Sequence, residues 1–407
     1  MRLLLAAAAA AATAAAAAAA TAAASAPVVW HAASSAGVLV VYADDSYALF
    51  AAADAAEAWL VSGPTSVHVN GAWFSTAAAA PAPAPNCSAP LHDIDCRNSD
   101  LYYFNTTSIA DCCENCSATP ACGAWTFTGV TEQRAADPPP SWANRCYIKA
   151  GCDHQGYSGH TSGIAPSAAP QPLTRVGAGP SGDGSGGYEI TYDANGTSIV
   201  TTFALNKSSD AFVFSQRFPQ GAAGGVNILT PVNSTSVGGS GGLREFASSG
   251  SPATQFPVFL EAPNSTIAAG LGYVSWAGRF FYSMGASSGG ANAAFGDAAV
   301  GAEGGPVVLF AGGAAGAAGA ALVLSPLDNF KSSMLGRPFA GAGAAAGVSG
   351  YVTSLPANFS TSTVALFGAA GVTDVMHAWG AALREHHGGA AKLADPSSEQ
   401  LTYWTDK

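Results

Sequence analysis

The distribution of apolar positions predicts many short strands. Gly37–Tyr42 and Ala211–Phe218 are clear examples, because apolar residues dominate each run and turn-forming residues follow it. The other predicted strands are Ser46–Phe50, Trp59–Thr65, Val67–Val69, Trp73–Phe74, Tyr188–Tyr192, Thr197–Phe203, Phe256–Leu260, Ala268–Trp276, Arg279–Ser283, Pro306–Phe310, Ala321–Leu324, Gly350–Ser354 and Thr363–Phe367. Strands of this length with Gly-rich connections indicate a mainly β protein, built on an antiparallel β-sandwich.

Two Asn-Gly dipeptides predict tight hairpins within this pattern. Asn70-Gly71 follows Val67–Val69, and Asn195-Gly196 separates two predicted strands. Both residue types tolerate the positive φ angles of a two-residue hairpin turn. The strands on either side of each dipeptide are therefore expected to pair.

Helical periodicity emerges near the end of the chain. Asp374 is expected to be the N-cap of a helix, and Gly388-Gly389 is expected to end it. The residues predicted to share its apolar face are Val375, Trp379, Ala382 and Leu383. We expect a new domain to begin there, covering residues 373–407.

The cysteines define a separate module. All eight lie between Cys87 and Cys152, at Cys87, Cys96, Cys112, Cys113, Cys116, Cys122, Cys146 and Cys152. Pro- and Ala-rich segments at residues 77–85 and 165–172 flank them, and such segments are semi-rigid linkers. We therefore predict an inserted module over residues 86–164, between two parts of one sandwich at residues 27–80 and 165–372.

The N-terminus predicts secretion. Met1-Arg2 precedes a long run of Leu and Ala, and small residues near position 24 allow cleavage, so residues 1–26 are expected to be a signal peptide. No later apolar run suggests a membrane anchor. Eight Asn-x-Ser/Thr sequons are predicted glycosylation sites: Asn86, Asn105, Asn115, Asn195, Asn206, Asn233, Asn264 and Asn358. In an oxidising compartment, eight cysteines predict disulfides.

Charge excludes one class of partner. The net charge is −11 and only 10% of residues are charged. A nucleic-acid-binding protein needs a clustered basic face. No nucleic-acid partner is therefore expected.

The centre of the module predicts a helix that carries several cysteines. Ser108-x-x-Asp111 has the spacing of a capping box, so a helix should begin at Ile109. Cys112 and Cys113 must have different disulfide partners, because adjacent Cα atoms are about 3.8 Å apart, closer than a disulfide normally allows. Cys113-Glu-Asn-Cys116 also fits a CxxC metal or redox motif, but no second CxxC stands at zinc-ribbon spacing.

This module resembles the PAN/apple domain over about residues 92–163. The resemblance rests on Asp111-Cys-Cys-x-x-Cys116, Pro120-x-Cys122-x-Ala124-x-Thr-Phe127, Cys146-Tyr-x-Lys149 and Ser162-Gly163. It implies a small α+β fold, in which disulfides hold a helix to an antiparallel sheet, and a role in binding proteins or glycans. It also implies the pairs Cys112–Cys146 and Cys116–Cys122. Three pairings stay open for the other four cysteines, of which Cys96–Cys113 with Cys87–Cys152 is preferred.

No motif in the chain predicts a catalytic or cofactor site. Gly238–Gly242 and Gly285–Gly289 match a nucleophile elbow without the strand and helix that it requires. The Gly177–Gly187 segment matches a dinucleotide-binding fingerprint without its helix. His386-His387 reads as a solvated pair, and no spacing selects two catalytic carboxylates among Asp183, Glu189, Asp193 and Asp210. We therefore assign no catalytic residue, metal or cofactor.

The flanking sequence resembles a second family. Trp59–Thr65, Phe212–Pro219 and Leu324–Phe330, with Leu401-x-Tyr-Trp-Thr-Asp406, are similar to the N-terminal β-supersandwich of large secreted proteins related to raffinose synthase and α-galactosidase. In that family a catalytic (β/α)₈ barrel follows. The resemblance implies a glycoside-hydrolase-like host whose catalytic residues would lie beyond Lys407.

The sequence is therefore compatible with three functions. We expect a secreted glycoprotein that binds a glycan or an extracellular protein through its PAN/apple-like module. The alternatives are the N-terminal fragment of a carbohydrate-active hydrolase, and a pure adhesion or matrix protein.

Overall fold

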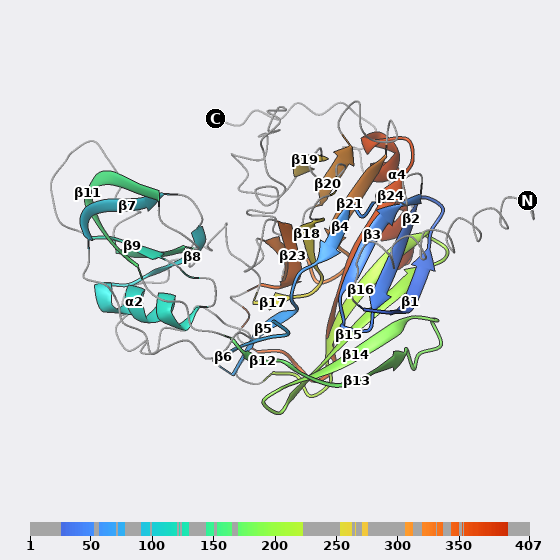
Figure 1. Ribbon diagram of the computed structural model, residues 1–407, viewed down its shortest axis with the longest axis horizontal. Helices are drawn as coiled ribbons and strands as arrows, with labels where there is room; N and C mark the ends of the chain where they lie inside the picture. The colour runs from blue at the N-terminus through green and yellow to red at the C-terminus, as the bar shows by residue number, and fades with distance from the viewer. Residues whose placement is uncertain are drawn as a thin grey trace, which may run out of the picture.

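In the residues that the structure describes, the chain folds as a mainly β protein with four sheets (Figure 1). The computed structural model describes residues 26–52, 57–70, 72–77, 91–97, 100–119, 122, 124–129, 144–149, 153–164, 170–222, 253–262, 265, 271–275, 306–311, 320–330, 332–336, 343–349, 352 and 354–389. Residues 1–25 of the predicted signal peptide, residues 78–85 and 165–169 of the two predicted linkers, the Arg279–Ser283 strand and residues 390–407 lie outside these ranges. The end of the second predicted linker is instead part of a strand, Gln171–Pro172.

Two large antiparallel sheets form the sandwich. The first has the order β1 (Val28–Ala33), β2 (Gly37–Tyr42), β3 (Tyr47–Ala51), β4 (Leu60–Ser62), β18 (Val258–Glu261), β23 (Gly343–Val348) and β22 (Ser333–Gly336). The second has the order β13 (Thr174–Pro180), β14 (Tyr188–Ala194), β15 (Thr197–Asn206), β16 (Ala211–Phe218), β24 (Phe359–Gly368), β21 (Ala321–Pro326), β20 (Val307–Ala311) and β19 (Leu271–Ser275). The first sheet therefore contains strands from both sides of the cysteine-rich segment, whereas every strand of the second sheet follows that segment in the chain.

Aromatic side chains join the two sheets. Tyr47 of β3 contacts Phe203 of β15 and Phe214 of β16, with ring centroids 5.3 Å and 5.6 Å apart. Trp59 lies 5.5 Å from the ring of Phe367 on β24. The Tyr47–Phe203 and Trp59–Phe367 pairs are edge-to-face, an arrangement that adds stability beyond the area it buries. They form the centre of the sandwich core.

Helix α4 (Val372–His386) covers the outer face of the eight-stranded sheet (Figure 1). Val375 and Ala382 are buried there, and Trp379 and Leu383 pack against the same cluster. The predicted face and the Gly388-Gly389 end are confirmed, since both glycines have positive φ. The predicted N-cap is wrong: Gly371 is the cap, and the Asp374 carboxylate, inside the first turn, accepts a hydrogen bond from the Ala370 N–H.

A small third sheet lies where the cysteine-rich segment joins the sandwich. Its order is β12 (Gln171–Pro172), β6 (Ala72–Ser75), β5 (Ser66–Val69) and β17 (Thr254–Gln255). β12 runs parallel to β6, and the Leu173 N–H donates to the Ser75 carbonyl at 2.9 Å. The chain therefore returns beside the strand from which it left.

The described residues between 91 and 164 form a separate sheet on which a helix packs. The sheet order is β7 (Leu91–Arg97), β11 (Asp153–Ile164), β9 (Ala124–Thr128), β10 (Arg145–Lys149) and β8 (Asp100–Asn105). Helix α2 (Ile109–Ala118) packs on β9 and β10. Figure 1 shows this unit beside the sandwich, away from the two large sheets. Below, these residues are called the module.

Most predicted strands are present, with three instructive differences. Both Asn-Gly hairpins are confirmed by the pairing of Val69 with Ala72 and of Ala194 with Thr197. The prediction of a strand at Gly350–Ser354 is wrong, because Val352 and Ser354 are not in a strand and the nearby strand is β23. β23 was missed because it is mainly Ala and Gly, and β13 because nearly all its residues are exposed.

Candidate functional site

A hydrogen-bonded cap begins the helix of the module. The Ser108 hydroxyl accepts from the Asp111 N–H, as the sequence predicted. The return contact of a capping box is indirect, because the Thr106 hydroxyl donates to the Asp111 carboxylate and accepts from the Ser108 N–H. Thr106 thus fixes the approach of β8 to α2.

Two disulfides attach this helix to its surroundings. Cys112 bonds to Cys146 on β10 with a Cα–Cα distance of 5.5 Å. Cys116 forms a disulfide with Cys122, with a Cα–Cα distance of 5.3 Å. These are the two pairs that the PAN/apple resemblance implied. A zinc or redox role for Cys113-x-x-Cys116 is not supported, because the Cys116 sulfur is bonded elsewhere.

Cys113 also takes part in a disulfide. Its predicted partner, Cys96, lies on β7, but the side chains of Cys87, Cys96 and Cys152 are outside the described part of the structure. The pairing of these four cysteines stays a prediction.

The two faces of the module sheet differ in chemistry. Side chains alternate between faces along a strand. Cys146 and Ile148 point toward α2, and Trp125 and Phe127 of β9 stand opposite them in register. This apolar face forms the core of the module, together with the disulfides.

The opposite face is polar and aromatic. Three residues of β10 alternate with its core residues: Arg145, Tyr147 and Lys149. On the neighbouring strand β8, Tyr103 stands opposite Tyr147. The Arg145 guanidinium lies 4.9 Å from the centre of the Tyr103 ring, and Lys149 Nζ lies 5.4 Å from the Tyr147 ring. Such distances favour cation–π attraction. We call these four residues the tyrosine–cation face.

Hydroxyl groups extend this face across the sheet. Thr126 and Ser162 share a hydrogen bond of 2.7 Å, and Thr126 stands opposite Tyr147. Arg145 and Lys149 are buried, whereas Tyr147 is half-buried. The face therefore combines aromatic rings, cations and hydroxyls, of which Tyr147 is a partly solvent-accessible member.

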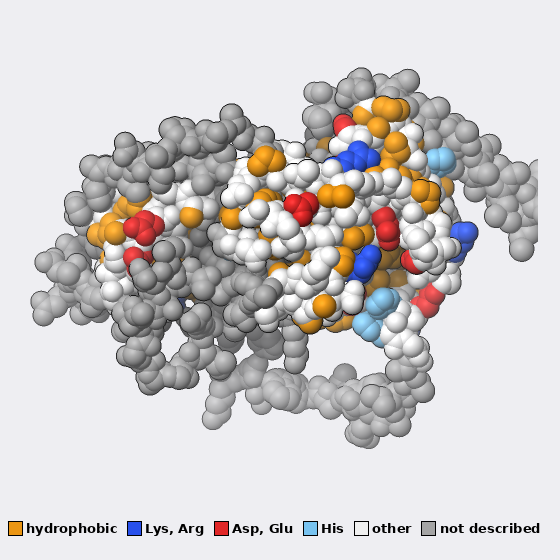
Figure 2. Space-filling view, turned by 90° about the horizontal axis from the view of Figure 1, so that it is seen from below, with side chains coloured by type: hydrophobic (Ala, Val, Ile, Leu, Met, Phe, Trp, Pro, Cys, Tyr) orange, Lys and Arg blue, Asp and Glu red, His pale blue; other side chains and the backbone are white. Residues whose placement is uncertain are grey.

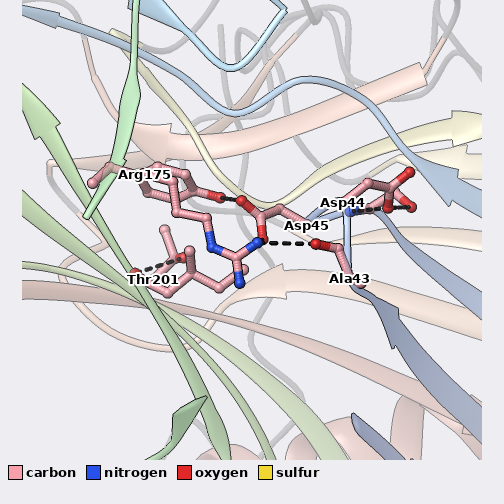
Figure 3. A network of polar contacts seen from close by, with 8 residues as sticks. Ala43, Asp44, Asp45, Arg175 and Thr201 are labelled. Carbon is pink, nitrogen blue, oxygen red and sulfur yellow. Dashed lines mark hydrogen bonds and ion pairs between the residues drawn. The ribbon is translucent and has the colours of Figure 1, made fainter. Parts of the chain in front are cut away.

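A second polar network lies in the sandwich (Figure 3). Asp45, in the turn between β2 and β3, forms an ion pair with Arg175 of β13 at 3.0 Å and accepts a hydrogen bond from the Tyr192 hydroxyl at 3.2 Å. Arg175 also donates to the Ala43 carbonyl. Burial raises the pKa of the Asp45 carboxyl, although Arg175 and Tyr192 oppose the shift. Burial also raises the pKa of Tyr192.

The network links chain segments rather than surrounding a ligand. Its members come from the β2–β3 turn, β13 and β14, and each polar contact joins two of these. Among the described residues, no cluster of His, Cys, Asp and Glu is arranged to hold a metal ion.

The carboxylates considered from the sequence are not gathered into a catalytic pair. Asp193 caps its hairpin through the Gly196 N–H, and Asp210 accepts from the Ser35 N–H. Asp183 and Glu189 both accept a hydrogen bond from the Ser181 hydroxyl. Hydrogen bonds from Ser181 and then Ser185 lower the pKa of Asp183 to about 2, so it is a carboxylate that holds an exposed turn.

The other sequence candidates also have structural roles where they are described. Gly177 and Gly179 belong to β13, and the glycines that follow lie in the turn before β14. His386 and His387 lie at the end of α4, where His387 Nε2 contacts the Leu327 carbonyl at 3.0 Å. Gly238–Gly242 and Gly285–Gly289 lie outside the described residues.

The sequons differ in their surroundings. Asn105, Asn195 and Asn358 are exposed. Asn206 accepts hydrogen bonds in its own turn, and Asn115 lies inside α2. Asn86, Asn233 and Asn264 lie outside the described residues.

Figure 2 shows the charged side chains of the described residues dispersed over the visible face, with both signs interspersed. In the part of the chain that the structure describes, no helix is both long and apolar enough to span a membrane.

Sequence reasoning missed the tyrosine–cation face and the Asp45 network. Alternation in Arg145-Cys-Tyr-Ile-Lys149 was the available signal for the former, because alternate residues of a strand share a face. Asp45 and Arg175 are far apart in sequence, and only the sheet topology brings them together.

In comparisons with known proteins, no family model matches this chain, and no curated protein matches it significantly.

Proposed function

We propose that this protein is a secreted glycoprotein that binds carbohydrate through its PAN/apple-like module. The observation that carries the proposal is the junction at β6 and β12. The sandwich sheets pair without any strand of the module, and the chain leaves and rejoins its host at adjacent strands. A disulfide-stapled unit attached in this way is well placed to recognise a ligand while its host keeps its own core.

The chemistry of the tyrosine–cation face supports a glycan ligand. Ligand sites combine aromatic surface with a few fixed polar groups. Tyr147 offers ring surface and a hydroxyl, while Lys149 and Arg145 provide positive charge beside it.

The host is proposed to be related to the β-supersandwich of secreted glycoside-hydrolase-like proteins. Support comes from the sandwich itself and from the segments Trp59–Thr65, Phe212–Pro219 and Leu324–Phe330, which resemble that family. The proposed role of the sandwich in this chain is to carry the module, and no catalytic residue is assigned to it.

The test is a glycan array probed with the full chain and three variants. One variant replaces residues 78–169 with a flexible linker of about eight residues, long enough to connect β6 to β12. The second is Tyr147→Ala. The control is Val176→Ala, which truncates a side chain that is 66% exposed on the host strand β13.

We expect the full chain and the control to bind, and the module-less variant to lose binding. Tyr147→Ala should weaken binding by about 1–3 kcal/mol, as for other aromatic contacts. Undiminished binding by the module-less variant would assign the activity to the sandwich. Capture of an extracellular protein with no glycan signal would instead favour the adhesion alternative.

A further inference from the structure

Two sequons lie ten residues apart in the same module and have opposite surroundings. Asn105 is the last residue of β8, and both Asn105 and its sequon hydroxyl residue Thr107 are exposed. Asn115 lies within α2, which extends from Ile109 to Ala118. The pair therefore offers an internal comparison.

All three residues of the second sequon are engaged by the fold. The Asn115 amide nitrogen donates to the Asp111 carbonyl at 2.8 Å. Cys116 is fully buried in its disulfide with Cys122, and Ser117 is only 5% exposed. The helix and the disulfide together therefore make the sequon inaccessible to the glycosylating enzyme.

Helical geometry separates the Asn115 amide from the Ser117 hydroxyl, the two groups that the glycosylating enzyme must bind. Transfer requires the Asn amide and the Ser or Thr hydroxyl to enter one enzyme site. Residues two apart on an α-helix point about 200° apart around its axis. Asn115 and Ser117 cannot meet this requirement while α2 is formed.

We infer that folding and oxidation of the module gate glycosylation at Asn115, so that the native protein carries a glycan at Asn105 and not at Asn115. Glycosylation would join Asn115 Nδ2 to the anomeric carbon of a lipid-pyrophosphate-linked oligosaccharide, releasing the lipid pyrophosphate and a proton. Closure of Cys116–Cys122 removes two electrons and two protons, which a lumenal disulfide oxidoreductase accepts. The first reaction needs an open chain, and the second closes it.

The inference rests on the proposed secretion, and the test separates the two. The full chain is expressed in a eukaryotic secretory host and deglycosylated enzymatically in heavy-oxygen water, which marks each formerly glycosylated Asn for peptide mass spectrometry. Because a closed site is presented only in its minor open state, occupancy at Asn115 should be at least about tenfold below that at Asn105.

Two perturbations distinguish folding from the chemistry of the tripeptide. Cys122→Ser leaves Asn115-Cys116-Ser117 unchanged but prevents the closing disulfide. A brief pulse of reductant during synthesis opens the wild-type disulfide without any substitution. Both should raise Asn115 occupancy several-fold toward that of Asn105, while Asn105 occupancy stays constant.

Each outcome is decisive. Equal occupancy of Asn105 and Asn115 in the oxidised, secreted protein would overturn the gating. So would an Asn115 occupancy that stays low under both perturbations, because the tripeptide itself would then be a poor acceptor. Absence of glycan from both sites would overturn the proposed secretion and the gating with it.

Discussion

Replacing Asp45 with Asn tests whether the partly exposed ion pair between Asp45 and Arg175 stabilises the sandwich. The side chain of Asp45 is 13% exposed and that of Arg175 is 40% exposed. The residue has a φ of 69°, a conformation that Asn tolerates as well as Asp. Asn also keeps an oxygen that can accept from Tyr192 or Arg175. The substitution therefore removes the charge and preserves the shape.

The direction of the pKa shift determines the expected sign. Because the pKa of Asp45 is raised on folding, the folded state binds its proton more tightly than the unfolded state. The contribution of Asp45 to stability is then greatest below its unfolded pKa and is lost as the pH rises through the folded pKa. Compared with the unfolded chain, the folded protein therefore favours the neutral carboxyl of Asp45 over its ionised form.

The expected change in the free energy of unfolding follows from the solvent exposure of the Arg175 side chain. A pair with one partner this accessible contributes about 0–1 kcal/mol. We expect Asp45→Asn to change the free energy of unfolding by less than about 1 kcal/mol at pH 7. Asp45→Ala should cost about 2–4 kcal/mol, because the buried Tyr192 hydroxyl loses its acceptor and Ala is strained at positive φ.

Urea unfolding followed by tryptophan fluorescence measures these differences at pH 7 and near pH 4. Lowering the pH should increase the stability of the wild type relative to Asp45→Asn, since only the wild type gains a proton at this site. A loss above about 2 kcal/mol for Asp45→Asn at pH 7, shrinking as the pH falls, would show that the ion pair dominates and would refute the reasoning.

Three further substitutions test the fold, each by urea unfolding. Tyr47→Phe should cost about 1–3 kcal/mol, because the Tyr47 hydroxyl bonds both the N–H and the carbonyl of Val258 in the core; an unchanged midpoint would contradict this. Gly347→Ala should be strongly destabilising, since φ is 158° and a Cβ would collide with backbone, whereas Gly177→Ala meets no atom within 4 Å and should have little effect. Ser108→Ala should cost about 1 kcal/mol through loss of the α2 cap, and Ser108→Asp should restore it.

The sequence predicted local structure well where one residue type has one strong conformational preference. Asn195-Gly196 produced the expected hairpin because both residues adopt positive φ. Ser108 and Ile109 marked the start of α2 because few residues can satisfy the first free N–H groups of a helix. Such signals involve neighbours in the chain, so they need no knowledge of the fold.

The sequence predicted local structure less well where packing or exposure determines the conformation. β23 consists of Gly, Ala and Val, and it is a strand because its small residues fit closely against β18. Asp374 looked like a cap, yet Gly371 begins α4 one turn earlier, because its positive φ of 94° sets the entry into the helix. The sequence pattern alone does not decide whether β23 is a strand or which residue caps α4. Tertiary contacts decide both.

By itself, the sequence determined the mainly β class, the clustering of the cysteines in one module and the two flanking parts of the sandwich. These depend on composition, alternation and turn residues, which act locally. Only the tertiary structure placed β12 beside β6, paired Tyr103 with Tyr147, and brought Asp45 to Arg175. Those contacts join distant segments, so their energies depend on strand order and register, which no local pattern in this chain specifies.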